Sequence, residues 1–376
     1  MQRSADVIII GAGIIGSSIA YFLGKRGVNV LVLDKNEIGS QSSSAAAGLL
    51  APIRPLAKED NYRRLLLDGI KRLPAIVPEL EEATNIDVEY RLTGTLRVLP
   101  RDKKKSVSDW VTSYKQAGFH VEMLSPDEAH EREPLLFSEL CAAVAIAEEG
   151  QVNPINLTQA YAGAAKALGA TFYEHCEVVG IQQASDQEKV TGIRTVEGEV
   201  FSCNHLVIAT GAWSACCGQW LHWTLPVYPV RGQIVALKQP ASPIKHIIFD
   251  EGLYDEDIYI APKPNNGLII GATKADVGFN TSVTAGEILH LLDVGTRLVP
   301  ALEQCEITRT WAGLRPKTPN SRPILGAVPG WENVFVASGH GGFGIMLSAI
   351  TGETLAEQIA TGHIPDIIRP FQPEAS

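Results

Sequence analysis

Three glycines near the N-terminus have the spacing of a pyrophosphate-binding turn. Residues 11–16 read Gly-Ala-Gly-Ile-Ile-Gly. In this pattern Gly11 permits a tight turn, Gly13 lets a pyrophosphate approach the backbone, and Gly16 lets the following helix pack on the strand. Asp34, 18 residues after Gly16, can accept hydrogen bonds from a ribose diol, and its carboxylate would repel a 2′-phosphate. The spacing predicts a dinucleotide site and disfavours NADP. The alternative is a tight turn that binds no ligand.

An arginine and a tyrosine in the second half of the chain could hold a carboxylate. Arg315 lies in the small and apolar stretch 311–316, where a guanidinium needs an anion. The α-carboxylate of a substrate matches its planar fork, and a protein carboxylate is the alternative partner. Tyr259 alternates with isoleucines in the stretch 257–262, so its side chain points away from theirs. On a pocket wall its hydroxyl could share the carboxylate with Arg315; otherwise it is a half-buried strand tyrosine with its hydroxyl at the surface.

The elements that would carry these residues indicate an α/β fold. Residues 6–10 and 28–33 are apolar runs typical of parallel strands buried on both faces, and residues 17–23 between them predict a helix. A further strand, 204–209, leads into the turn Thr210-Gly211-Ala212-Trp213-Ser214. Small residues over 39–50 would let the backbone line a flat polar ligand. A small-residue helix packed on the sheet is the alternative for this segment.

Composition favours an enzyme that acts on small molecules. The 376 residues are 45% hydrophobic and 20% charged, which excludes a disordered chain. The net charge of −10 argues against nucleic acid or an anionic membrane as the main partner. The sequence shows no apolar run long enough to span a bilayer and no secretory leader, so we expect a cytoplasmic protein. The six cysteines lack zinc-site spacing, so we predict no metal site and interpret them as core residues in a reducing compartment.

Several motifs occur in the order typical of one enzyme family. They are GAGIIG, SSSAAAGLL, ATGAWS, DIYIAPK, GLIIGAT, WAGLRPKT and SGHGGFGI. Over residues 5 to 365 the chain resembles the D-amino-acid-oxidase family of FAD enzymes, and within it the glycine oxidase branch of thiamine biosynthesis. The resemblance implies a Rossmann-like FAD-binding domain of the glutathione-reductase type, made of residues 1–50, 145–220 and 305–376. It also implies a substrate domain with a mixed or antiparallel sheet, made of residues 51–144 and 221–304. Short strands predicted over 91–99, 227–237, 258–262 and 268–272 support that division.

The resemblance also implies which residues contact FAD and substrate. Arg315 and Tyr259 would hold the substrate carboxylate. The FAD-binding residues would be Gly11, Gly13, Ile14, Ile15, Gly16, Asp34, Lys35, Ser42, Ser43, Ala46, Ala47, Gly48, Val178, Thr210, Gly211, Trp213, His340, Gly341, Gly342, Phe343, Gly344 and Ile345.

The last glycine-rich stretch, residues 338–345, opens a predicted helix whose N–H groups would stabilise negative charge on a reduced flavin. His340 in this loop fits a structural or flavin-edge role better than acid–base catalysis.

Two positions depart from the glycine oxidase pattern. Gly342-Phe343 stands where an Arg-Asn pair is typical, and Lys274 stands where a methionine is typical. Lys274 is a substrate-pocket candidate that would favour an acidic substrate; the alternative is a solvated turn lysine. Cys305 lies in a different context from the cysteine that attaches flavin in monomeric sarcosine oxidases, so we expect non-covalent FAD.

The reaction implied is oxidation of the Cα–N bond of glycine or another small amino acid, such as a D-amino acid or sarcosine. Hydride would pass to flavin N5, the imine would hydrolyse to a 2-oxo acid and ammonia or an amine, and oxygen would become hydrogen peroxide. One alternative is a D-amino-acid or sarcosine dehydrogenase that passes electrons to a quinone or partner protein. Another is a non-catalytic FAD-binding subunit, which predicts loss of Arg315 or Tyr259. The sequence leaves the oligomeric state open, a homo-oligomer included.

Overall fold

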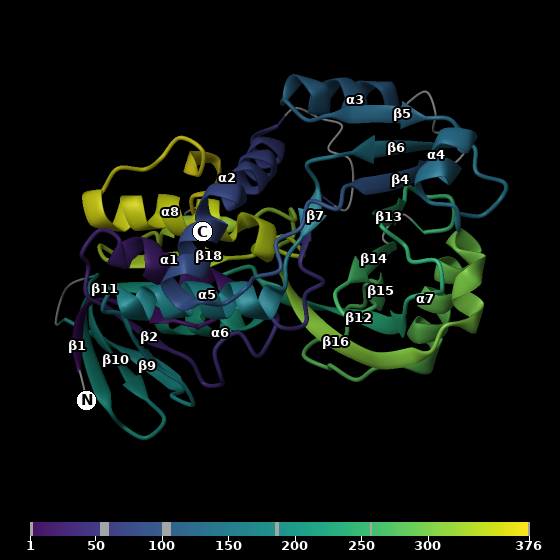
Figure 1. Cartoon of the computed structure of the whole chain (residues 1–376). Helices are drawn as coiled ribbons and strands as arrows, with labels where there is room; N and C mark the ends of the chain where they lie inside the picture. The colour runs from purple at the N-terminus through teal and green to yellow at the C-terminus, as the bar shows by residue number, and fades with distance from the viewer. Residues whose placement is uncertain (1–2, 53–59, 100–106, 185–187, 256–257, 375–376) are drawn as a thin grey trace.

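Two eight-stranded sheets form the framework of the chain. The computed structural model describes residues 3–52, 60–99, 107–184, 188–255 and 258–374. In Figure 1 the first sheet lies at the left beneath a layer of helices, and the second sheet lies at the right. The two sheets confirm the predicted combination of an α/β unit with a mixed sheet.

The first sheet is built around parallel strands from distant parts of the sequence. Its main path runs β17 (Ile324–Ala327), β18 (Val334–Ser338), β11 (Val200–Ile208), β1 (Ser4–Ile10), β2 (Val30–Leu33) and β8 (Thr171–Tyr173). Two further strands, β10 (Val190–Thr195) and β9 (Val178–Gln183), extend antiparallel from β11. β1 pairs in parallel with both β2 and β11. The predicted strands at 6–10, 28–33 and 204–209 are therefore confirmed, and the apolar residues 7–10, 30–33 and 206–208 within them are buried.

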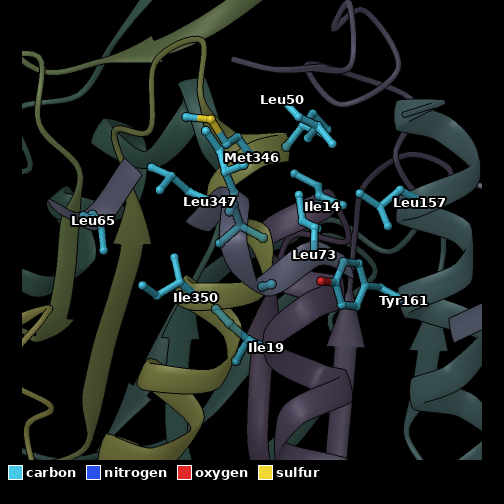
Figure 2. Packing of buried hydrophobic residues seen from close by; sticks show 14 of the residues in the cluster. Ile14, Ile19, Leu50, Leu65, Leu73, Leu157, Tyr161, Met346, Leu347 and Ile350 are labelled. Carbon is cyan, nitrogen blue, oxygen red and sulfur yellow. The ribbon is translucent and has the colours of Figure 1, made fainter. Parts of the chain in front are cut away.

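Four helices cover one face of this sheet (Figure 1): α1 (Ile14–Gly24), α2 (Asn61–Thr84), α5 (Pro154–Ala167) and α8 (Gly344–Thr361). All 11 residues of α1 are buried, because it packs between α5 and α8. Figure 2 shows side chains of α1, α2, α5 and α8 meeting in one core: Ile14, Ile19, Leu73, Tyr161 and Ile350. Each large apolar side chain buried there contributes about 1.5–3 kcal/mol. Within the described ranges no helix is long and apolar enough to cross a membrane.

The second sheet is mixed. Its order is β16 (Ile307–Lys317), β12 (Tyr228–Lys238), β15 (Gly267–Gly271), β14 (Tyr259–Lys263), β13 (Ile247–Asp250), β4 (Thr95–Leu99), β6 (Ala142–Ile146) and β5 (Val121–Leu124). β13 and β4 are parallel, and the other neighbours are antiparallel. α7 (Ala285–Leu298) packs on β12 and β15, while α3 (Val107–Gln116) and α4 (Pro126–Arg132) pack near β5. The short strands β3 (Leu49–Leu50) and β7 (Gly150–Gln151) pair with each other, and the short helix α6 (Ser214–Gly218) follows β11.

Three elements bear on the predicted domain boundaries. β16, in the segment assigned to the FAD domain, forms an edge of the second sheet. β6 spans the predicted boundary between residues 144 and 145. α2, in the segment assigned to the substrate domain, packs on α5 and α8 beside the first sheet. The division into two domains stays a prediction. These contacts place β16 and β6 with the second sheet and α2 with the helices of the first sheet.

A buried ion cluster ties the second sheet to neighbouring segments. Arg97 on β4 is fully buried, and its Nη1 donates to Glu251 at 2.7 Å. Its Nη2 donates to both carboxylate oxygens of Glu149 at 2.9 and 3.0 Å and to the carbonyl of Pro52 at 2.7 Å. The guanidinium also lies 4.5 Å from the ring centroid of Phe249 on β13. Arg97 therefore joins segments that follow β3, β6 and β13.

Replacing Arg97 should expose the cost of burying this cluster. We expect Arg97→Met to lower the free energy of unfolding by about 3–5 kcal/mol, because Glu149 would remain buried without its counter-charge. The measurement is urea unfolding followed by circular dichroism. Arg194→Met, at an exposed position on β10, serves as control and should change stability by no more than about 0.5 kcal/mol. Equal stability of the two variants would show that the Arg97 cluster does not hold these segments together.

Candidate active site

A cavity of about 480 Å³ lies where the two sheets meet. Its lining includes the C-terminal ends of β1, β2 and β11, the N-termini of α1 and α8, and much of the segment 39–51. Residues of β12, β14 and β16 from the second sheet complete it. The site is therefore made by both sheets, and ligands in α/β proteins commonly bind at such C-terminal strand ends.

The glycine turn brings backbone atoms very close together. Gly11 has a φ of +107°, and a Cβ there would lie 2.5 Å from the carbonyl oxygen of Ala209. A Cβ on Gly16 would lie 1.9 Å from the carbonyl oxygen of Gly11. These approaches confirm the predicted roles of Gly11 in the turn and of Gly16 in packing helix on strand. Gly13 is the N-cap of α1 and lines the cavity, and as a glycine it adds no side chain of its own at the positive end of this helix.

Asp34 lies at the cavity wall directly after β2. Its Oδ2 accepts the amide of Ala12 at 2.7 Å, and its Oδ1 accepts the amide of Asn36 at 2.8 Å. Burial raises the pKa of Asp34 above its usual value, and the two amide bonds oppose that shift. Beside it, Lys35 Nζ lies 4.9 Å from the ring centroid of Trp213, and both residues line the cavity. The orientation of Asp34 suits a carboxylate that receives ribose hydroxyls.

The small-residue segment forms consecutive turns over residues 38–45, so the alternative of a packed helix is wrong. Ser43 Oγ accepts the amide of Ile14 at 2.9 Å, and Ser42 Oγ donates to the carbonyl of Leu314 at 2.6 Å. Trp311 Nε1 donates to the carbonyl of Ala45 at 3.1 Å. These bonds hold the segment between α1 and β16, where its small side chains line the cavity.

Arg315 and Tyr259 reach this cavity from different strands of the second sheet. The guanidinium of Arg315 lies over Gly232 on the neighbouring strand β12, where a Cβ would be 2.3 Å from Nη1. Nη1 donates to the carbonyl of Thr273 at 2.9 Å. Ile258 and Ile260 pack in the core beneath α7, so Tyr259 points the other way, as the alternation predicted. Burial raises the pKa of the Tyr259 phenol although Arg315 opposes this, so its hydroxyl remains a hydrogen-bond donor.

The last glycine-rich loop places His340 in the wall of the cavity. His340 is buried, and its Nε2 lies 3.1 Å from Thr351 Oγ1. Burial lowers the pKa of His340 to about 3, so the imidazole is neutral at physiological pH. This environment suits the structural role predicted for His340 and makes proton transfer by it unfavourable.

Most of the predicted site residues line one cavity. They are Gly11, Gly13, Ile14, Ile15, Asp34, Lys35, Ser42, Ser43, Ala46, Ala47, Gly48, Val178, Thr210, Gly211, Trp213, Tyr259, Arg315, His340, Gly341, Gly342, Gly344 and Ile345. Gly16, Phe343 and Lys274 lie outside the lining. Phe343 packs against Tyr62 with ring centroids 6.3 Å apart, and Lys274 is exposed after β15. Their individual roles in binding stay predictions.

Sequence reasoning missed several residues of the cavity wall. Cys176, Cys216 and Cys217 line it, although their spacing along the chain gives no sign of this. Cys305 was compared above with the cysteine that attaches flavin in monomeric sarcosine oxidases. It packs at the margin of the second sheet's core. Ile234 also lines the cavity, and its place in the predicted strand 227–237 was the signal that could have found it.

The fold and the site together define a dinucleotide-binding oxidoreductase of the flavoprotein class. A glycine turn, the acid Asp34 and a helix N-terminus lie in one cavity with an arginine and a tyrosine from a second sheet. The family model described as DAO, FAD dependent oxidoreductase, matches residues 6–358. The chain belongs to this family.

Known proteins of similar sequence and fold agree with this assignment. The glycine oxidase of Geobacillus kaustophilus is 34% identical over 99% of this chain and 97% of its own length. The crystal structure of glycine oxidase from that organism has a TM-score of 0.91 at 34% identity, covering 99% of this chain and 98% of the other. The bifunctional protein ThiO/ThiG of Trichormus variabilis is 33% identical over 94% of this chain and 52% of its own length. The L-proline dehydrogenase of P. horikoshii has a TM-score of 0.88 at 26% identity, covering 98% of this chain and 96% of the other.

FAD is the cofactor of this family, and the cavity fits it. Gly13 and the N-terminus of α1 would receive the pyrophosphate, and Asp34 the ribose of the adenosine. The segment 42–48 and the loop 340–345 would flank the flavin. This leaves Arg315 and Tyr259 on the wall contributed by the second sheet.

Removing the Asp34 carboxylate should weaken cofactor binding. We expect Asp34→Ala to cost about 1.5–3 kcal/mol of FAD affinity, or roughly ten- to a hundredfold, with little change in the rate of the loaded enzyme. The measurement is titration of acid-prepared apoprotein with FAD, and acid release of the flavin tests non-covalent binding. Asp6→Ala, at an exposed position in β1, is the matched control. Unaltered FAD affinity in Asp34→Ala would show that the carboxylate does not contact the cofactor.

Proposed function

We propose that the protein oxidises the Cα–N bond of glycine or another small amino acid, with D-amino acids and sarcosine included in the class. The observation that carries the proposal is the meeting of Arg315 and Tyr259 in the cavity that fits FAD. A guanidinium fork and a neutral phenol are the donors that an α-carboxylate needs. The relatives named glycine oxidase support the same substrate class.

In this reaction the protein acts by binding and orientation. Arg315 and Tyr259 fix the substrate carboxylate, so Cα and the neutral amine face the flavin side of the cavity. The chemistry that bound FAD would supply is acceptance of the hydride from Cα and return of two electrons to oxygen, which would yield hydrogen peroxide. The amine lone pair drives hydride departure, so no side chain has to remove a proton from carbon. The imine takes up water and breaks down to a 2-oxo acid and ammonia, or an amine if the substrate nitrogen is methylated.

The electron acceptor is the point on which the rival proposal differs. In the rival proposal the protein is a dehydrogenase that passes electrons to a quinone or a partner protein. The structural likeness to an L-proline dehydrogenase supports this rival. The retained Arg315 and Tyr259 argue against a non-catalytic subunit. A role in thiamine biosynthesis is also part of the proposal, and it is supported by the relative named ThiO/ThiG.

Anaerobic mixing with amino acids tests the reaction directly. We expect glycine, sarcosine or a short D-amino acid to bleach the flavin absorbance, because hydride transfer reduces the cofactor. Admission of oxygen should restore the colour and produce hydrogen peroxide. Bleaching that oxygen reverses slowly, and an artificial quinone reverses fast, would favour the dehydrogenase. A flavin that no amino acid or N-methyl amino acid bleaches would overturn the proposal.

Arg315 is the residue on which the assignment to amino acids depends. We expect Arg315→Ala to lower kcat/KM by at least about a hundredfold, equivalent to roughly 2.7 kcal/mol. Arg315→Lys should recover only part of this, because an ammonium lacks the bidentate fork. The measurements are steady-state kinetics and melting temperature on the same samples. Normal kinetics in a folded Arg315→Ala protein would remove the carboxylate-anchor role.

A further inference from the structure

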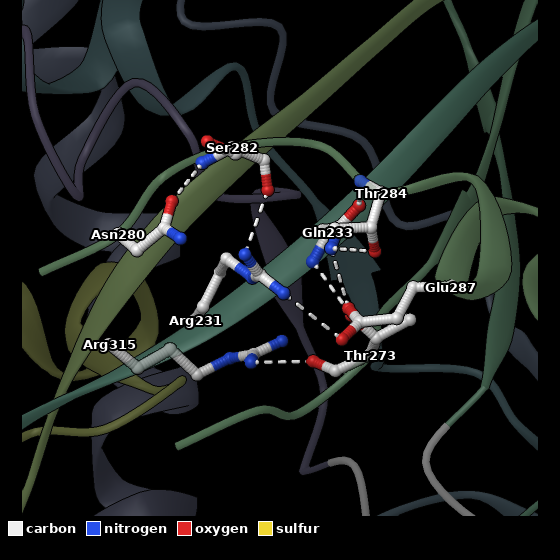
Figure 3. Close-up of polar contacts among 8 residues, drawn as sticks. All are labelled: Arg231, Gln233, Thr273, Asn280, Ser282, Thr284, Glu287 and Arg315. Carbon is white, nitrogen blue, oxygen red and sulfur yellow. Dashed lines mark hydrogen bonds and ion pairs between the residues drawn. The ribbon is translucent and has the colours of Figure 1, made fainter. Parts of the chain in front are cut away.

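A partly buried polar cluster lies directly behind Arg315 (Figure 3). At its centre is Glu287, in the first turn of α7. Its Oε1 accepts Arg231 Nη2 at 3.3 Å, and its Oε2 accepts Gln233 Nε2 at 2.7 Å. The hydroxyl of Thr273 also donates to Oε2. The positive end of the helix dipole favours a carboxylate at this position.

Thr273 links this cluster to the arginine. Its carbonyl accepts Nη1 of Arg315 at 2.9 Å. Its hydroxyl oxygen accepts the amide of Gln233 at 3.1 Å, and its own amide donates to the carbonyl of Gln233 at 3.3 Å. With the bond to Glu287, both backbone polar groups and the hydroxyl of Thr273 are engaged. The carbonyl that receives Arg315 therefore has a fixed direction.

The two arginines on the neighbouring strands β12 and β16, Arg231 and Arg315, have different partners. Arg231 on β12 is buried, its Nη2 donates to Glu287, and its Nη1 donates to the carbonyl of Ser282 at 2.9 Å. Arg315 on the adjacent strand β16 reaches the cavity wall instead. Glu287 neutralises Arg231, so the charge that this pair of strands presents to the cavity is that of Arg315.

We propose that Glu287, acting through Thr273, is a positioning residue that sets the angle of the Arg315 guanidinium toward the substrate carboxylate. This inference rests on the proposed function, in which Arg315 holds that carboxylate. Gly232 limits the guanidinium on one side, since a Cβ there would lie 2.3 Å from Nη1, and the Thr273 carbonyl holds its end. A bidentate fork depends on angle as well as charge, so a tilted guanidinium binds a carboxylate poorly.

Two variants break the link while leaving Arg315 in place. Thr273→Val removes the hydroxyl at nearly constant shape, and Glu287→Gln removes the charge at constant shape. Thr273→Ser keeps the hydroxyl, and Asp293→Asn changes an exposed carboxylate on the same helix, so these are the matched controls. The probe is acetate, a small carboxylate, titrated into the FAD-loaded enzyme and followed by perturbation of the flavin spectrum.

We expect Thr273→Val and Glu287→Gln to raise the Kd for acetate by at least about tenfold, since small misplacements of a binding group have large effects. The KM for the amino-acid substrate should rise with it, more than kcat falls. Thr273→Ser and Asp293→Asn should match the unaltered protein in both measurements. Melting temperatures recorded on the same samples separate misplacement from loss of fold.

The outcomes distinguish this inference from the proposed function. If Arg315→Ala abolishes acetate binding while Thr273→Val and Glu287→Gln leave it unchanged and lower only the melting temperature, the cluster is structural and the positioning role is wrong. If acetate binds equally well to Arg315→Ala, the carboxylate-anchor role itself fails, and with it the proposed function. Failure of Thr273→Ser to restore the Kd would also overturn the role of the hydroxyl.

Discussion

The close approach of backbone to backbone at the glycine turn is the constraint on which the site depends. The carbonyl of Gly11 occupies the space that a side chain on Gly16 would need, and the carbonyl of Ala209 presses on Gly11 itself. This contact lets β1 and β11 end at the same level and lets α1 begin there with its amides facing the cavity. Side chains at these positions would push α1 away from the sheet, and the cavity would lose its wall of backbone donors.

The second requirement is that the two sheets stay in contact beside the cavity. The segment 42–47 bridges it through three hydrogen bonds to the second sheet, from Ser42 to the Leu314 carbonyl, from Trp311 to the Ala45 carbonyl, and from Lys263 Nζ to the Ala47 carbonyl at 2.6 Å. This cavity-lining segment is therefore joined to β14 and β16, which carry Tyr259 and Arg315. Distances between flavin and substrate would depend on these bonds more than on either sheet alone.

How much of this could be predicted follows from how local each feature is. The turn at Gly11, the strand before it and Asp34 form one continuous unit, so spacing alone located them. Strand alternation placed Tyr259 correctly for the same reason. The contact between Gly232 and Arg315 depends on which strands become neighbours, and nothing in either segment announces that β12 pairs with β16 along eleven residues.

The features that could not be predicted from the sequence depend on contacts between segments that are not adjacent in the chain. β16 lies at the start of the segment 305–376 that was predicted for the cofactor domain, and its pairing with β12 attaches it to the second sheet. Glu287 lies in an ordinary helix start, where an acid is common for reasons of the helix dipole alone. Its contacts with Thr273 and Gln233 arise from packing of α7 on the sheet. Such contacts become visible only when the fold brings together positions that are 14 and 54 residues apart.

The protonation states around the carboxylate site suggest how the reaction is divided between protein and substrate. Arg315 keeps its charge at any physiological pH. Burial holds Tyr259 protonated and His340 neutral, so these described side chains of the wall change little between mildly acidic and mildly alkaline solution. In the proposed reaction, hydride transfer needs the neutral amine, and free amino acids carry an ammonium group. The substrate amine would therefore be the group that loses a proton, and Arg315 would be the fixed cation that keeps the carboxylate bound while it does so.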